Sequence, residues 1–113
     1  MEYQTIQLGS ANYNYGYRKI YNKEKQKILF LKEHQVFLYL YKKFNRPVTV
    51  YDIMDDVYDN EKEPHPDNIT LIISRLRKKI IDFGLDIVCI RKNRNKAGIR
   101  TYKLINSSCV NLS

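Results

Sequence analysis

The sequence lacks the long apolar runs that membrane proteins and exported precursors carry. Its most apolar segment, ILFLKEHQVFLYLY at 28–41, is broken by polar residues at 32–35 and stays below the roughly eighteen apolar residues of a membrane-spanning helix. The first ten residues also lack the basic and then apolar order of a signal peptide. These absences predict a cytoplasmic protein with no membrane partner.

Residues that bind metals or carry out catalysis are also scarce. Cys89 and Cys109 are too far apart for C-x-x-C zinc spacing, and two cysteines imply no disulfide framework. We expect Cys89 in a strand and Cys109 in a polar tail, both reduced. His34 and His65 are isolated, which is typical of surface or capping residues. Since no catalytic constellation or phosphate-binding glycine loop can be assembled, we expect no metal, no cofactor and no enzymatic activity.

Charge is abundant and unevenly distributed in this chain of 113 residues, whose length is that of one domain and whose net charge is +8. Residues 52–67 contain seven acids and only one cation, Lys62. Residues 75–103 contain ten cations and only two acids, Asp82 and Asp86. An acidic block followed by a basic block favours a surface that faces a charged partner, such as nucleic acid.

The first thirty residues have the pattern of short strands. TIQLG and YNYGYRKIY alternate residue types and contain Gly9 and Gly16. In a strand, Tyr13, Tyr15 and Tyr17 would share one face. This aromatic row has two interpretations, a stacking platform for single-stranded bases or a packing surface against a helix, and we favour packing because the row lies outside the most basic region.

Two helices are predicted next. Residues 33–45 place Phe37, Leu40, Tyr41 and Phe44 in one buried stripe, and Pro47 should end this helix. The second helix should begin at TVYD, where the Thr49 side chain can cap the helix and Asp52 can return a bond to the Thr49 N–H. Its apolar residues Ile53, Met54 and Val57 form one face, and an acidic loop with two prolines follows.

The third helix should start near Asp67 or Asn68, either of which is a good N-cap. Ile69, Ile73, Leu76 and Ile80 form a narrow stripe that should face the core. The opposite side carries Leu71, Ser74, Arg75 and Lys78. A leucine within a basic face, one turn before an arginine, suits a major groove, where it can contact a thymine methyl while the arginine binds guanine.

A β-hairpin should complete the chain. LDIVCIRK and GIRTYKL both alternate and are rich in β-branched residues, and the NRNKA between them contains turn-forming residues and cations. The cations of this turn would extend the basic strip beyond the third helix.

These elements together resemble the OmpR/PhoB-type transcriptional regulators. SRLRKKI at 74–80 resembles their recognition-helix signature, and IQLG, LKEHQVFLYL, VTVYDIMDDVY and RTYKL are similar to their first strand, first helix, second helix and closing strand. The resemblance covers roughly residues 6–105. It implies an α+β fold, a winged helix-turn-helix with N-terminal antiparallel strands, three helices and a C-terminal hairpin wing, in one domain over residues 1–105. The strands would occupy 1–30, the helices 31–83 and the wing 86–105, before a polar tail at 106–113.

The resemblance also implies a function and a site. The chain is expected to be a bacterial or phage regulator of transcription that binds double-stranded DNA, with the helix at about 67–82 in the major groove and the wing on the backbone or minor groove. In the helix, Arg75 is expected to read a base edge and Arg77 and Lys78 to hold phosphates. The implied DNA-binding residues are Asn68, Thr70, Leu71, Ile72, Ser74, Arg75, Arg77, Lys78, Lys79, Arg91, Lys92, Arg94, Lys96 and Arg100.

Other partners follow from the same resemblance. The acidic loop at 59–67 corresponds to a segment with which activators of the family contact RNA polymerase, and the protein is expected to act as a homodimer or in tandem on repeated half-sites. Two alternatives remain open. One is a winged-helix module that binds polymerase or another regulator, and the other is an RNA or single-strand binder that uses its tyrosines.

Overall fold

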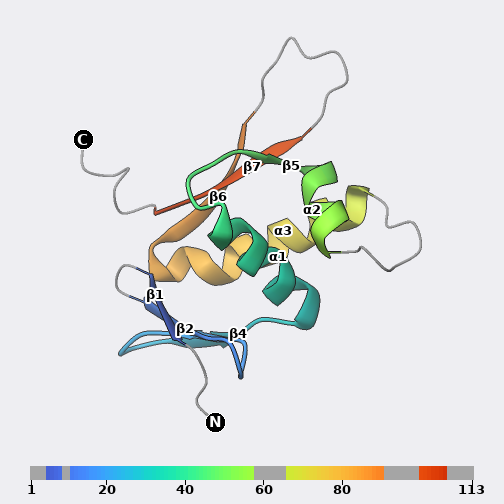
Figure 1. Ribbon diagram of the computed structural model, residues 1–113. Helices are drawn as coiled ribbons and strands as arrows, with labels where there is room; N and C mark the ends of the chain where they lie inside the picture. Colours follow the sequence, from blue (N-terminus) through green and yellow to red (C-terminus); the bar gives the residue numbers. More distant parts are fainter. Residues whose placement is uncertain (1–4, 9–10, 58–65, 91–99, 107–113) are drawn as a thin grey trace, which may run out of the picture.

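The structure, a computed structural model, describes residues 5–8, 11–57, 66–90 and 100–106. Two small antiparallel sheets lie on either side of the helices (Figure 1). In chain order the elements are β1 (Thr5–Leu8), β2 (Ala11–Asn14), β3 (Lys19–Tyr21), β4 (Gln26–Ile28), α1 (Leu31–Lys42), β5 (Val48–Thr49), α2 (Val50–Val57), α3 (Pro66–Ile80), a 3-10 turn (Ile81–Phe83), β6 (Leu85–Ile90) and β7 (Thr101–Asn106).

The N-terminal sheet has the strand order β1-β2-β3-β4, with every neighbouring pair antiparallel. Tyr13 pairs with Ile6 on one side and Ile20 on the other, and all three side chains are buried on the face toward the helices. The alternation predicted from the sequence therefore sets which face of this sheet joins the core.

The predicted row of three tyrosines is wrong. Only Tyr13 is in a strand, because the chain turns at residues 15–18 and Arg18 takes a positive φ of 53°. Tyr17 is consequently 60 % exposed at the turn, whereas the ring of Tyr13 packs edge-on against Phe37 at 4.9 Å between centroids. Packing against a helix, the interpretation that we favoured, is confirmed for Tyr13.

Helix α1 begins two residues earlier than predicted and ends three residues earlier. The Phe30 N–H donates to the Glu33 carboxylate at 2.9 Å, so the glutamate satisfies a backbone donor at the start of the helix. After Lys42 the chain turns through Asn45, whose φ is 66°, and the Asn45 N–H donates to the Leu104 carbonyl. Phe37 and Leu40 are buried as predicted, but Phe44 lies in this turn and is 38 % exposed.

Helix α2 begins with the predicted capping box. The Thr49 hydroxyl accepts from the Asp52 N–H at 3.1 Å, and the Asp52 carboxylate accepts from the Thr49 N–H at 3.0 Å. Ile53 is buried, while Met54 and Val57 are partly buried against the core. The predicted helix and its apolar face are confirmed.

Helix α3 buries the predicted stripe of Ile69, Ile73, Leu76 and Ile80. The predicted N-cap is wrong, because the helix already includes Pro66 and both Asp67 and Asn68 lie within its first turn. Proline suits a first helical position, since its missing N–H would have no partner within the helix there.

The C-terminal sheet has the order β5-β7-β6, and β6 and β7 form the predicted hairpin, in which Cys89 is an exposed strand residue opposite Tyr102. Leu85, Ile87, Tyr102 and Leu104 turn inward from it. The predicted turn of the wing and Cys109 lie outside the described residues, as does the loop before Pro66.

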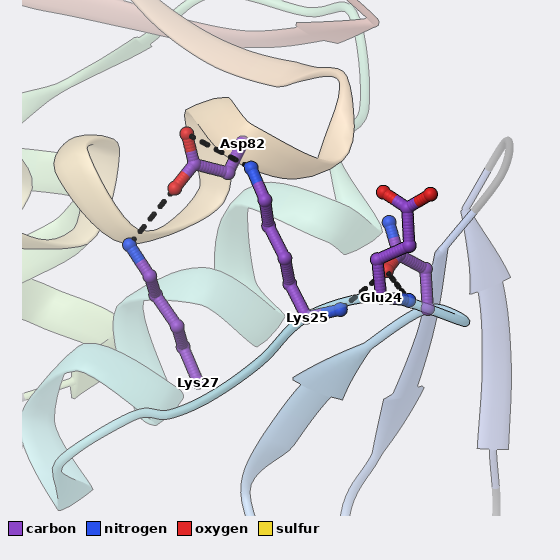
Figure 2. Close-up of polar contacts among 5 residues, drawn as sticks. Glu24, Lys25, Lys27 and Asp82 are labelled. Carbon is purple, nitrogen blue, oxygen red and sulfur yellow. Dashed lines mark hydrogen bonds and ion pairs between the residues drawn. The ribbon is translucent and has the colours of Figure 1, made fainter.

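Ion pairs connect the N-terminal sheet to the helices. Lys27 donates to the Asp82 carboxylate at 3.0 Å, and Lys25 approaches the other oxygen at 4.0 Å (Figure 2). The hydrogen bond from Lys27 and the charges of both lysines lower the pKa of Asp82. The pairs join β4 and the loop before it to the 3-10 turn after α3, so they link the sheet to the end of this helix.

Candidate nucleic-acid interface

The face of α3 opposite the buried stripe is open to solvent. Leu71 is 49 % exposed in the middle of this face, and Ser74, Arg75 and Lys78 are exposed around it. Asn68 is exposed in the first turn, while Thr70 and Ile72 are half-buried at the edges. The structure thus brings together on one helix an apolar contact, hydrogen-bonding groups and cations, as predicted.

Two of these cations have no partner among the residues that the structure describes. For Arg75 and Lys78, the part of the chain that the structure describes contains no hydrogen-bonding or ion-pair partner for the side chain. Within the described ranges no carboxylate compensates these positive charges, which attract anions from solvent. Binding a phosphate would release those ions without breaking a contact to any described residue.

Arg77 is held by a carboxylate on the hairpin. Its Nε donates to Asp86 Oδ1 at 2.5 Å and its Nη2 to Asp86 Oδ2 at 3.3 Å. The hydrogen bond and charge of Asp86 raise the pKa of Arg77. The sequence did not indicate this partner, because Asp86 was counted only as an acid within a basic region.

Lys79 points to the side of the helix opposite Arg77, toward the start of α1. Its Nζ donates to Glu33 at 2.7 Å and to the Ile28 carbonyl at 3.0 Å, and it lies 4.0 Å from the centroid of the Phe30 ring. Glu33 is the one charged residue that is buried among those the structure describes. Lys79 therefore compensates a buried carboxylate, and its assignment to the DNA-binding surface has no support from its surroundings.

Arg100, immediately before β7, reaches the first turns of α3. Its Nη1 lies 3.8 Å from Asp67 Oδ1 and 3.4 Å from the Thr70 hydroxyl, which is itself 3.3 Å from the Tyr102 hydroxyl. This contact places a guanidinium of the wing beside the exposed face of the helix. The other predicted wing residues, Arg91, Lys92, Arg94 and Lys96, lie outside the described residues.

A second charged surface lies on another side of the helices. An open groove of about 480 Å³ between α1 and α2 is lined by Tyr39, Lys42, Lys43, Asp52, Asp55 and Asp56. Partial burial, followed by the three aspartate charges, raises the pKa of Tyr39. The acidic block is evident in the sequence, but this groove is not, because its two walls come from different helices.

His34 faces the N-terminal sheet. Its Nδ1 lies 2.5 Å from the buried Tyr13 hydroxyl, and desolvation followed by the charge of Arg18 lowers its pKa. Burial raises the pKa of Tyr13. The predicted surface or capping role of His34 is wrong, because it is a half-buried packing residue.

Two features of other classes of protein are absent from the described ranges. None of the helices there has the length and apolar character to cross a membrane. No group of three or more His, Cys, Asp or Glu side chains there is arranged to hold a metal ion.

Comparisons with known proteins match this arrangement to one family and one fold. The family described as "Transcriptional regulatory protein, C terminal" matches residues 24–97. The DNA-binding domain of CadC from E. coli has a TM-score of 0.73 at 19 % identity, covering 91 % of this chain and 94 % of that domain. No curated protein sequence is significantly similar to the chain.

Two response-regulator domains are similar in fold. The C-terminal domain of the nisin resistance regulator NsrR has a TM-score of 0.71 at 20 % identity, with coverage of 89 % and 96 %. The DNA-binding domain of AdeR, solved with an intercistronic region, has a TM-score of 0.67 at 16 % identity, with coverage of 89 % and 99 %. The fold is thus a winged helix, and the chain belongs to the family of C-terminal, OmpR/PhoB-type DNA-binding domains of transcriptional regulators.

Proposed function

We propose that the protein recognises its DNA by placing α3 in the major groove, where Leu71 and Arg75 contact base edges and Lys78 holds a phosphate. The observation that carries this proposal is the exposed face of α3, where an exposed leucine shares one face with two cations that have no partner in the described ranges. Phosphate contacts would supply affinity for any duplex, and contacts with base edges would supply the discrimination.

The wing is proposed to contact the adjacent backbone or minor groove through Arg91, Lys92, Arg94, Lys96 and Arg100. Arg100 supports this assignment because it lies beside the first turns of α3, so the wing and the helix would meet the duplex together. Asn68, Thr70, Ile72 and Ser74 remain candidate contacts of the helix. Lys79 is omitted because its ammonium group is bound to Glu33.

Selection of bound sequences from a random duplex pool tests this proposal. We expect a motif with a preference of about a thousandfold over scrambled DNA. Arg75→Ala should then weaken binding to the motif by about 1 to 3 kcal/mol, and Lys78→Ala should weaken binding to motif and scrambled duplexes equally. Arg46→Ala is the matched control, because Arg46 is an exposed arginine outside α3. If Arg75→Ala weakened binding to both duplexes equally, the proposal that Arg75 reads a base would be wrong.

The same selection tests the arrangement of subunits. If the protein acts as a dimer or in tandem, the motif should contain two half-sites at a fixed spacing. A single half-site would indicate binding as a monomer. Bound to DNA in this way, the protein would work in the cytoplasm and would perform no chemistry of its own.

The groove between α1 and α2 favours a second role, contact with a basic surface of RNA polymerase. Asp55 and Asp56 lie on this groove and shortly precede the acidic segment 59–67 in the sequence. The double variant Asp55→Asn/Asp56→Asn should bind purified polymerase more weakly and DNA no more weakly than the native protein. Unchanged polymerase binding would exclude this surface.

A further inference from the structure

The contact between Arg77 and Asp86 uses only one edge of the guanidinium. Nε and one hydrogen of Nη2 point to the two carboxylate oxygens. A guanidinium has five N–H donors, so both hydrogens of Nη1 and the second hydrogen of Nη2 remain on the outer edge. That edge has the paired donors that fit two oxygens of one phosphate.

Asp86 is held more firmly than the arginine that it binds. Its Oδ1 also accepts from the Ile87 N–H at 2.8 Å, and its backbone belongs to the paired hairpin, opposite Ile105. The Asp86 side chain is 15 % exposed, whereas that of Arg77 is 55 % exposed. The carboxylate therefore lies behind the guanidinium, and the guanidinium faces solvent.

The position of Arg77 on α3 places it beside the exposed face of this helix. Ser74, one turn before Arg77, is exposed on this face. Lys78, which follows Arg77, is exposed there as well. A duplex that contacts Lys78 would bring its backbone close to Arg77. The partner that fits the outer edge of the guanidinium is a phosphodiester group of that backbone.

We propose that Asp86 is a positioning residue, which orders the Arg77 side chain so that its outer edge is ready to bind a DNA phosphate. This inference rests on the proposed function of α3. A free arginine loses rotamer freedom when it binds, and that loss weakens binding. Because Asp86 has already fixed the side chain, less freedom remains to be lost when DNA binds.

If Asp86 acted only through its negative charge, its removal would change DNA affinity in the opposite direction from the loss expected of a positioning residue. If the carboxylate only repelled phosphate or kept Arg77 away from it, removing its charge would strengthen DNA binding. If the carboxylate orders Arg77, removing it weakens DNA binding although the net charge of the protein rises. The direction of the change therefore separates the two roles.

The test is the affinity of Asp86→Asn for a mixed-sequence duplex and for the duplex chosen by selection. Asparagine keeps an acceptor for the Ile87 N–H but presents no second carboxylate oxygen to Arg77. We expect affinity for both duplexes to fall by about three- to tenfold, the range set by the ordering of one long side chain. The matched control is Glu24→Gln, which removes one negative charge from an exposed position in the loop between β3 and β4 and should leave affinity unchanged or raise it slightly.

Two further variants keep the test decisive. In an Arg77→Ala background, Asp86→Asn should no longer lower the affinity, because there is no guanidinium to order. Arg77→Lys retains the charge but not the paired donors, so it should lose nearly as much affinity as Arg77→Ala. The thermal unfolding midpoint of each variant shows whether the fold persists, and Asp86→Ser, which also leaves Arg77 without a carboxylate partner, takes the place of Asp86→Asn if that variant fails to fold.

The possible outcomes distinguish this inference from the proposed function. If the native protein fails to bind either duplex, the proposed function itself is wrong. If the native protein binds but Asp86→Asn matches Glu24→Gln, or binds more tightly, the positioning role is overturned. If the loss from Asp86→Asn persists without Arg77, Asp86 acts through the hairpin and the inference is also overturned.

Discussion

Replacing Lys79 by methionine removes the cation that compensates Glu33 while keeping a side chain of similar length. The Glu33 side chain is 3 % exposed and accepts from Lys79 Nζ at 2.7 Å and from the Phe30 N–H at 2.9 Å. Losing one partner of a buried ion pair costs about 3 to 5 kcal/mol. Because Lys79 reaches solvent along part of its length, we expect the lower value, about 3 kcal/mol.

Unfolding in urea measures this loss. Thermal unfolding gives a second measurement of the same loss. For a domain of this size, a loss of about 1 kcal/mol lowers the thermal midpoint by about 4 °C, so the midpoint of Lys79→Met should fall by about 12 °C. The double variant Glu33→Gln/Lys79→Met should recover most of the stability, because no buried charge then remains without a partner. Lys78→Met is the matched control, since the adjacent lysine is exposed and its loss should change stability by less than about 0.5 kcal/mol.

For DNA binding we expect the opposite pattern, in which Lys78→Met has an effect and Lys79→Met has none. Lys78→Met should reduce the slope of log affinity against log salt by about 0.9, the value for one lost phosphate contact, whereas Lys79→Met should leave the slope unchanged. If Lys79→Met left stability within about 0.5 kcal/mol and reduced the salt slope, Lys79 would be a DNA-binding residue and its structural role would be refuted.

Two other predictions concern stability. Thr49→Ala removes the hydroxyl that accepts from the Asp52 N–H and should lower the free energy of unfolding by about 1 kcal/mol, as measured in urea, with Thr49→Ser as the variant that keeps the bond. His34 has a folded-state pKa below its ordinary 6.5, so the unfolded state binds more protons between the two values. The contribution of His34 to the free energy of unfolding is therefore fully present above about pH 7.5. It decreases as the pH drops through 6.5 toward the folded-state pKa. Thermal midpoints at pH 7.5 and pH 5 should differ more for the native protein than for His34→Gln, and equal differences would refute the role of this histidine.

Local signals in the sequence were sufficient for much of the fold. The buried stripe of α3 follows from its 3.6-residue period, and the start of α2 follows from a threonine and an aspartate three residues apart. Both depend on neighbours within one helix, so no knowledge of the tertiary structure was needed. The hairpin follows equally from local alternation on each side of turn-forming residues.

The errors occurred where distant contacts decide local structure. Phe44 matched the apolar period of α1, but the helix ends before it because Asn45 turns the chain and binds the Leu104 carbonyl on β7. Tyr15 and Tyr17 continued the alternation of Tyr13, but a turn at Gly16 and Arg18 removed them from the strand. A period in the sequence shows what an element would bury if it continued, and it does not show where the element ends.

The basic block is a further case in which distant contacts matter, because the sequence does not show which of its cations are paired within the protein. Arg77 and Lys79 differ little from Lys78 in the sequence, yet Arg77 is bound by Asp86 and Lys79 by Glu33, which is 46 positions away. Charge compensated within the protein contributes less to counterion release than free charge, because binding DNA must then compete with an existing partner. The number of cations in the block therefore overestimates the salt dependence of binding. Among the α3 cations, Arg75 and Lys78 should account for most of the salt dependence, with Arg77 adding a contact whose strength depends on its own carboxylate.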